Sequence, residues 1–316
     1  MAWGEETFGS YTGFLLQESD NVSEEVETCA KTFKVVEGDY NIGVFGDNYE
    51  YLFSRVFSSI LSLKRDGKEV LSGVPMPVYT RAFTDNDKGN GLDFDSALFK
   101  LASSSQKACK VNVEHDDKKV KIEYSYKIAA FAETIVKVAY EVSDDGVIGV
   151  TMNYPGFKDA PLLPEFGLSI PVVKDYNSFT YYGLGPEENY IDRNNGVKLG
   201  IYENKVTNML TEYARPQECG NRSGVRKLSI LDGGEKLISI EMEDKPFEFS
   251  FLPNSTEELD AALHIDELPK SRHNTLKILY KQMGVGGDDS WGAPVHKEYQ
   301  IKGDESIEFK FKIVLS

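Results

Sequence analysis

The last strand-length segment of the chain alternates apolar and polar residues with a period of two. Residues 307–315 carry an apolar side chain at every second position, from Ile307 to Leu315. Because successive side chains of a strand point to opposite faces, this pattern predicts a β-strand with one buried face. A surface helix would instead repeat its apolar residues every three to four positions. The segment therefore constrains the chain to build a half-buried sheet.

The same period recurs along the chain between short turns rich in Asp and Gly. Alternating runs flank the turns at 66–67, 116–117, 144–146 and 232–234, and a further run spans residues 247–251. Asp and Gly favour the tight turns that join hairpin strands. Many strands with short connections and polar outer faces predict an all-β fold, a large antiparallel sandwich.

Helical signals are few, so we expect one or two short helices. Residues 255–258 have the Ser-to-Glu spacing of a capping box, which marks a helix start. Residues 95–102 form a second candidate helix, with Ala97, Leu98 and Leu101 on one face.

Composition excludes several classes of function. A formal net charge of −16 over 316 residues disfavours nucleic acid and anionic membrane surfaces as partners. No apolar stretch has the length that a membrane span requires. The three cysteines, Cys29, Cys109 and Cys219, show no C-x-x-C spacing, which is typical of reduced thiols in a cytoplasmic protein.

A loop dense in glycine and aspartate ends at one of the two tryptophans. Residues 284–291 read Gly-Val-Gly-Gly-Asp-Asp-Ser-Trp. Trp291 therefore follows turn chemistry and can present its indole to a sugar ring, or it can fold back and cap the domain. Asp288 and Asp289 can contact sugar hydroxyls or orient the loop through turn hydrogen bonds. We favour the orienting role, since Asp in such turns usually bonds the local backbone.

Four ordered motifs resemble those of the family-2 β-galactosidases. Residues 286–291 resemble the GGDDSW signature, and residues 182–193 resemble the GxGPxENYPDR stretch with Ile191 in place of Pro. Residues 80–89 resemble the TRAxxDNDxG stretch, and residues 213–226 resemble the YxxPxExGxRxxxR loop. The resemblance is to the C-terminal domain of those enzymes, which is also the small chain of two-chain β-galactosidases. It implies a galactose-mutarotase-like β-supersandwich.

The beginning of the chain resembles a different part of the same enzymes. Residues 1–28 are similar to the last strands of the small β-sandwich domain that precedes the supersandwich, followed by an acidic linker. We therefore expect two domains, over 1–28 and 29–316. The chain is then either the C-terminal part of a longer enzyme or a natural small subunit that starts at Met1.

The resemblance implies a part of a retaining β-galactosidase that hydrolyses terminal β-D-galactose from lactose-like substrates. Retaining enzymes use two carboxylates about 5 Å apart. By resemblance both belong to a separate (β/α)8 barrel, so we assign no catalytic residue to this chain. Trp291 is implied to be a platform for the sugar in that barrel's active site. Residues 216–226 resemble a mobile loop, in which Glu218 and Arg222 could bond each other or the barrel, with Gly220 as a hinge.

Two polar clusters stand in apolar surroundings. A buried Arg must be well paired or it costs several kcal/mol, so we interpret both clusters as structural networks or domain-interface contacts. The first contains Arg81, Asp85, Asn86 and Asp87, and the second contains Glu188, Asn189, Asp192 and Arg193.

The implied partners are the catalytic part of the same β-galactosidase and a β-galactoside, in an enzyme expected to be oligomeric. We expect no cofactor or metal in this chain, with any magnesium or monovalent cation bound in other domains. Two alternatives stay open: a free-standing aldose mutarotase or epimerase, and a carbohydrate-binding module. A mutarotase would use a His acid and a Glu base. None of the histidines lies in a mutarotase-like motif, and we interpret all four as exposed: His115, His264, His273 and His296.

Overall fold

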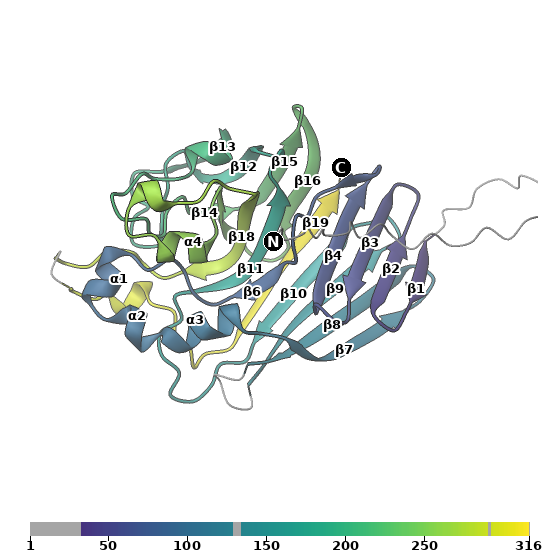
Figure 1. Cartoon of the computed structure of the whole chain (residues 1–316), viewed down its shortest axis with the longest axis horizontal. Coiled ribbons are helices and arrows are strands. Elements are labelled where there is room, and N and C mark those ends of the chain that lie inside the picture. The colour runs from purple at the N-terminus through teal and green to yellow at the C-terminus, as the bar shows by residue number, and fades with distance from the viewer. Residues whose placement is uncertain (1–32, 129–133, 290–291, 316) are drawn as a thin grey trace, which may run out of the picture. The chain divides into compact units, whose positions relative to one another are not determined.

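The computed structural model describes residues 33–128, 134–289 and 292–315. Residues 31–316 form one compact unit, in which the described strands pair antiparallel (Figure 1). Residues 1–28 lie outside the described residues, so the preceding domain expected there stays a prediction. No helix of the described residues is long and apolar enough to cross a membrane.

Three sheets make up the described part of the chain. The nine-stranded sheet has the order β13-β12-β15-β16-β19-β10-β9-β8-β7, and the two five-stranded sheets have the orders β1-β2-β3-β4-β5 and β14-β17-β18-β11-β6. The strands of the first five-stranded sheet are β1 (Lys34–Glu37), β2 (Asn41–Phe45), β3 (Tyr49–Ser54), β4 (Ser59–Arg65) and β5 (Lys68–Glu69). Those of the second are β6 (Met76–Val78), β11 (Glu165–Val173), β14 (Arg222–Val225), β17 (Phe247–Leu252) and β18 (His273–Gln282). Those of the large sheet are β7 (Ala108–His115), β8 (Lys119–Lys127), β9 (Ile135–Ser143), β10 (Ile148–Tyr154), β12 (Ser178–Gly185), β13 (Lys198–Lys205), β15 (Lys227–Asp232), β16 (Glu235–Met242) and β19 (Ile307–Leu315).

Both five-stranded sheets pack on the large sheet and enclose one apolar core. Tyr51 of β3 donates a hydrogen bond to the carbonyl of Gly146, in the turn between β9 and β10, at 2.8 Å. Phe249 of β17 meets Phe179 of β12 edge-on, with ring centroids 5.7 Å apart. The buried cluster draws on all three sheets, which confirms the expected all-β, antiparallel sandwich.

The alternation rule holds for strands such as β10 and β19 but fails for others, among them β17 and β18. In β19 the buried residues run from Ile307 to Leu315 at every second position. The four predicted hairpin turns join β4 to β5, β7 to β8, β9 to β10 and β15 to β16. In β17, however, Glu248 and Ser250 are buried together with the phenylalanines, so this strand is covered on both faces.

The described helices are short and gather around one end of the second five-stranded sheet (Figure 1). They are α1 (Asp85–Gly89), α2 (Leu92–Asp95), α3 (Ala97–Ser104) and α4 (Thr256–Ala261), with 3-10 turns η2 (Val206–Asn208), η3 (Ile265–Glu267) and η4 (Lys297–Tyr299). The capping box predicted at Ser255 and Glu258 is confirmed at the start of α4.

The apolar face noted in the sequence of α3 is not the face that meets the core. Leu98 and Leu101 are 40% and 54% exposed, whereas Phe99 and Ala102 are buried. The ring of Phe99 packs against Phe157, with centroids 6.2 Å apart, and an aromatic ring buries more apolar area than a leucine does. The helix is apolar on both faces, so the spacing of its leucines does not reveal which face meets the core.

Candidate functional site

The four sequence motifs meet in one polar assembly beyond the end of β18. Its first element is α1, which is not among the helices predicted above. The Thr84 hydroxyl accepts a hydrogen bond from the Asp87 N–H at 3.0 Å, and the Asp87 carboxylate accepts one from the Thr84 N–H at 3.0 Å. This capping box starts the helix and fixes Asp87 at its inner side.

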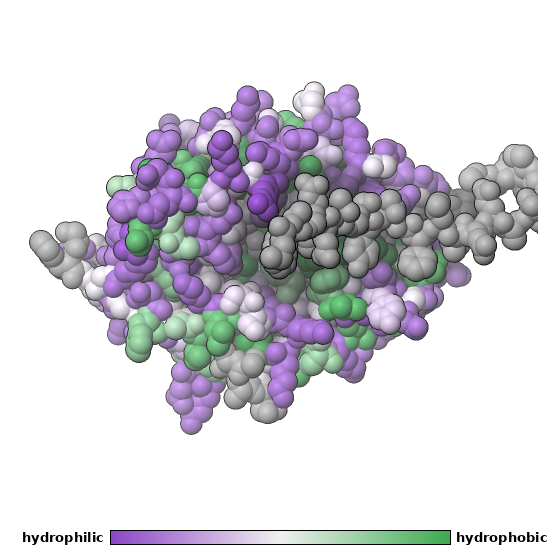
Figure 2. Space-filling view, viewed as in Figure 1, coloured by the Kyte–Doolittle hydropathy of each residue, from purple (hydrophilic) through white to green (hydrophobic). Residues whose placement is uncertain are grey.

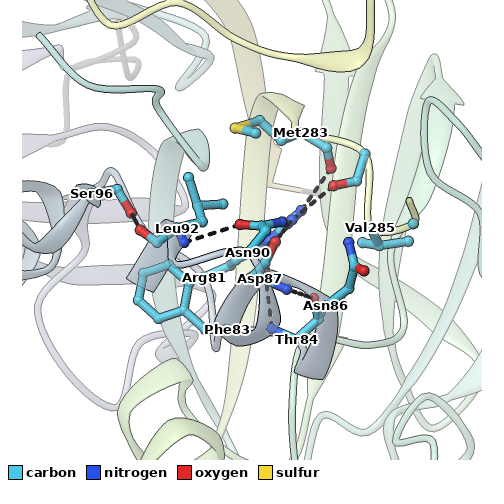
Figure 3. A network of polar contacts seen from close by, with 12 residues as sticks. Arg81, Phe83, Thr84, Asn86, Asp87, Asn90, Leu92, Ser96, Met283 and Val285 are labelled. Atoms are coloured by element: carbon cyan, nitrogen blue, oxygen red, sulfur yellow. Dashed lines mark hydrogen bonds and ion pairs between the residues drawn. The ribbon is translucent and has the colours of Figure 1, made fainter. Parts of the chain in front are cut away.

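Arg81 and Asp87 form a buried, two-pronged ion pair. The guanidinium donates from Nε and Nη2 to the two carboxylate oxygens, at 3.0 and 2.8 Å, and both side chains are excluded from solvent. Its Nη1 and Nη2 also donate to the carbonyls of Met283 and Gly284, at 2.6 and 2.8 Å (Figure 3). Burial acts to lower the pKa of Arg81, but the Asp87 carboxylate outweighs burial and raises it. The guanidinium therefore stays charged and holds the beginning of the 284–291 loop.

Asp192 holds the next two residues of that loop. Its Oδ2 accepts hydrogen bonds from the N–H groups of Val285 and Gly286, at 2.9 and 2.8 Å. A Cβ on Gly284 would lie 2.7 Å from the Asp192 carboxyl carbon and 2.7 Å from a Val295 methyl group, so only glycine fits there. The backbone of the loop is thus fixed from residue 283 to residue 286.

Asp288 and Asp289 are exposed and bond to the far limb of the loop. Asp288 Oδ1 lies 2.8 Å from His296 Nε2, and Asp289 Oδ1 accepts a hydrogen bond from the Ala293 N–H at 3.2 Å. The Asp288 carboxylate raises the pKa of His296. Both aspartates thus orient the loop through local bonds. Ser290 and Trp291 lie outside the described residues, so the role of Trp291 stays a prediction.

Glu188 ties the second polar cluster to the 213–226 loop. Its carboxylate accepts hydrogen bonds from the Gly220 N–H at 2.7 Å and from the Thr211 and Tyr213 hydroxyls, both at 3.2 Å, and it pairs with Arg193. Partial burial acts to raise the pKa of Glu188, but the Gly220 amide and the Arg193 guanidinium hold it below its usual value.

Asn189 extends this connection to the loop's second half. Its Nδ2 donates to the carbonyls of Leu184 and Glu187, and its Oδ1 accepts from the Ser223 N–H at 3.0 Å. Within the first cluster, Asn86 donates to the Ala293 carbonyl at 3.4 Å, and the Asp85 N–H and carboxylate bond the Gln217 side chain. Both clusters therefore connect segments of this chain, and a role for them at a domain interface stays a prediction.

Glu218 and Arg222 find separate partners on opposite sides of Gly220. Arg222 Nε donates to the Tyr181 hydroxyl at 3.2 Å and to the Pro186 carbonyl at 2.9 Å. Glu218 is buried and bonds to residues of β18. Gly220 has φ +74°, and a Cβ there would lie 2.7 Å from the Met209 carbonyl oxygen. The loop is thus anchored at three successive points in this structure, and its movement stays a prediction.

Two buried charges beside Glu218, those of Lys277 and Glu165, are not among the residues expected from the sequence. Lys277 of β18 lies 2.8 Å from Glu165 Oε2 and 2.9 Å from Glu218 Oε2, with all three side chains nearly inaccessible. Gln282 Nε2 also donates to Glu218, at 2.9 Å. Burial raises the pKa of Glu165, whereas the two carboxylates outweigh burial at Lys277 and raise its pKa. Lys277 stands between Leu276 and Ile278, a pattern that the period-two rule places in solvent, so the sequence gives no local signal for its burial.

Glu248 is a third buried carboxylate in the same region, and no cationic side chain bonds it among the described residues. Its Oε2 accepts hydrogen bonds from Asn221 Nδ2 at 3.0 Å and from the Gln282 N–H at 3.2 Å. Burial raises its pKa to about 7, against the effect of these two donors. Asn221 belongs to the loop, so the ionisation of Glu248 acts on a contact that anchors the loop.

In the part of the chain that the structure describes, the histidines and the other possible metal ligands form no second candidate site. His115, His264 and His296 are exposed, but His273 is half-buried at the start of β18, so the expectation of four exposed histidines is wrong for this residue. Among the described residues, no group of three or more His, Cys, Asp or Glu side chains could hold a metal ion.

Replacing Arg81 with Met should lower the free energy of unfolding by about 3–5 kcal/mol, because it leaves Asp87 buried without its cation. The matched control is Arg193→Met, since Arg193 is half-exposed and its ion pair should contribute about 1 kcal/mol or less. Urea unfolding measures both values. Equal losses in the two variants would contradict the structural role of the buried pair.

Glu248→Gln should stabilise the protein at alkaline pH. The pKa of Glu248 is raised in the folded state, so the penalty for ionising it is fully present above about pH 7 and disappears as the pH falls toward the unfolded value near 4.5. The variant should exceed the wild type by on the order of 2–3 kcal/mol at pH 8, with the difference shrinking by pH 5. Urea unfolding at both pH values measures it. Glu50→Gln, on the exposed face of β3, should show no such trend, and a pH-independent difference for Glu248→Gln would refute the assignment.

Comparisons with known proteins agree with the motifs. The family model described as β-galactosidase small chain matches residues 45–315. A β-galactosidase of Halalkalibacterium halodurans is 42% identical over 283 residues, which are 89% of this chain and 28% of that enzyme. A β-galactosidase small subunit of Latilactobacillus sakei is 34% identical, over 90% of this chain and 98% of its own length.

Among solved structures, the fold is similar to a galactose mutarotase related enzyme from Lactobacillus acidophilus. The sequence identity is 9%, the TM-score is 0.44, and the match covers 90% of this chain and 97% of that one. The family match spans most of the chain, and the small subunit is matched over nearly all of its length. The chain therefore belongs to the β-galactosidase small chain family.

Proposed function

We propose that this chain is the non-catalytic C-terminal domain, or the small subunit, of a retaining family-2 β-galactosidase. It completes the active site of a catalytic (β/α)8 barrel that belongs to another part of the enzyme. The observation that carries the proposal is the clamp on the 284–291 loop, where Arg81 and Asp192 fix four successive backbone groups. A loop held so firmly at its root suits the presentation of one side chain to a neighbouring site.

Trp291 is the side chain that this loop would present. An indole stacks on the apolar face of a galactoside, and its neighbours Asp288 and Asp289 keep the loop in shape through bonds to His296 and Ala293. The barrel would supply the two catalytic carboxylates, and any magnesium or monovalent cation would be bound there as well. The 216–226 loop would shift as substrate moves deeper, with Gly220 as the hinge.

Relatives support the need for a larger partner. The chain spans 28% of the Halalkalibacterium halodurans β-galactosidase, and the Latilactobacillus sakei relative is named as a small subunit. Activity toward lactose-like β-galactosides would thus appear only when this chain joins a catalytic part.

The proposed need for a catalytic partner can be tested by reconstitution. This chain is mixed with the part of the Halalkalibacterium halodurans enzyme that lies outside the matched region. We expect hydrolysis of a chromogenic β-galactoside by the mixture and by neither component alone. Hydrolysis or rapid anomer exchange of galactose by the chain alone, followed by NMR, would instead indicate a free-standing enzyme. Tight galactoside binding by the isolated chain would indicate a carbohydrate-binding module. A mixture that stays inactive would overturn the proposal.

Trp291→Ala should weaken substrate binding in the reconstituted enzyme without affecting folding. We expect KM to rise about tenfold or more, equivalent to about 1.4 kcal/mol of lost binding, with an unchanged melting temperature. Trp291→Phe should recover part of the loss, because it keeps an aromatic face. Steady-state kinetics and thermal unfolding measure the two effects, with Trp3→Ala as the control. Parallel losses of melting temperature and activity would show that the indole caps the domain instead.

A further inference from the structure

The short helices α2 and α3 carry large apolar side chains on their solvent side. Leu92, Phe99 and Ala102 are buried, as a surface helix requires. Phe94 of α2 is 84% exposed, and Leu98 and Leu101 of α3 are 40% and 54% exposed. These three residues, spaced by four and three positions, are called the α2–α3 stripe below. Large apolar side chains on the outer side of a helix, in addition to those on its buried side, are typical of a helix that is covered on both sides.

A hollow with a mixed polar and apolar lining lies beside the stripe. It has a volume of about 590 Å³ and is lined by Leu92, Asp95 and Leu98 and by the segment 159–162 between β10 and β11. Ala160, Pro161 and Leu162 give its floor an apolar character, while the exposed Asp95 and Asp159 stand at its edge. Figure 2 shows hydrophobic side chains gathered over α2 and α3 in this region. The surface thus combines apolar contact area with an acidic border.

The helix α1, which directly precedes α2, contacts the far limb of the 284–291 loop. Asn86 of α1 bonds the Ala293 carbonyl, and a Cβ on Gly89 would lie only 3.4 Å from the Gly292 Cα. Figure 1 shows α1 and α2 beside the yellow segment that contains the loop. A partner that contacts residues 292–293 of this loop therefore also lies close to α1, which leads into α2.

We propose that the α2–α3 stripe and its hollow are the docking surface for the catalytic part of the β-galactosidase. This inference rests on the proposed function and names the surface through which it operates. The catalytic part would bring apolar side chains into the hollow and basic side chains to its acidic border. A second copy of this chain fits less well, because it would set Asp95 and Asp159 of both copies against each other in a molecule of net charge −16.

Charge variants of the stripe test the docking surface. Phe94→Asp and Leu101→Asp should each weaken the association of the full chain with the catalytic part at least tenfold, measured as Kd by surface plasmon resonance. Both side chains are exposed, so the melting temperature should change little. The control is Ile201→Asp on β13, whose side chain is 79% exposed on a different strand edge and should leave Kd unchanged. Activity at saturating chain should stay at the wild-type level in all three variants.

The outcomes separate the two proposals. A wild-type chain that restores no activity overturns the proposed function and the docking surface with it. A wild-type chain that restores activity, with equal Kd for the stripe variants, overturns the docking surface alone. Self-association of the isolated chain that Phe94→Asp abolishes, in sedimentation velocity, would assign the stripe to a second copy and also overturn it. Weaker association at 0.5 M than at 0.05 M salt supports the acidic border, and an affinity insensitive to salt overturns that part.

Discussion

The geometry of the candidate site depends on one buried ion pair. Moving a guanidinium out of water costs several kcal/mol, and only a complete set of acceptors offsets that cost. Arg81 finds two acceptors in the Asp87 carboxylate and two in the carbonyls of Met283 and Gly284. These contacts are directional, so a displacement of the loop root by even 1 Å would leave a buried charge underpaired. The bonds from Arg81 to the Met283 and Gly284 carbonyls thus position the loop and also offset the cost of burying the guanidinium.

The sandwich supplies the platform on which this pair can form. β18 ends at Gln282, one residue before the carbonyls that Arg81 binds, so the sheet fixes the position of the loop root. On the outer side of the same sheet, Lys277 and Gln282 reach Glu218, and Glu248 reaches Asn221. Apolar packing holds the sheets together without preference for direction, whereas these polar bonds set the register of the loops on them.

The sequence predicts the sandwich well because its signals are local. Alternating strands and Asp-Gly turns can be recognised within a window of about ten residues, as in β19 and the hairpin of β15 and β16. The helix α1 carries a local signal as well, since Thr84 and Asp87 have the spacing of a capping box. The buried face of α3 cannot be recognised in the sequence, because that helix carries large apolar side chains on both faces.

The assembly of the site is less predictable because its bonds are distant. Arg81 binds carbonyls some two hundred positions away, and a carbonyl leaves no mark in the sequence. Glu248 and Lys277 alternate with apolar residues, so the period-two rule places them in solvent. They are buried because loops cover the outer face of their sheet, which is a property of tertiary structure alone.

In the proposed function, this domain must be rigid where it presents a side chain, and it must leave exposed the surface that its partner covers. Rigidity follows from the clamp at residues 283–286, because a misplacement of about 1 Å at a catalytic centre can cost about a hundredfold in rate. The exposed surface contains Phe94 and Leu101, which contribute little burial free energy to the isolated domain. The stability of this fold therefore comes from its core and the geometry of its loops from the polar assembly, while the exposed apolar surface is what the proposed partner would cover.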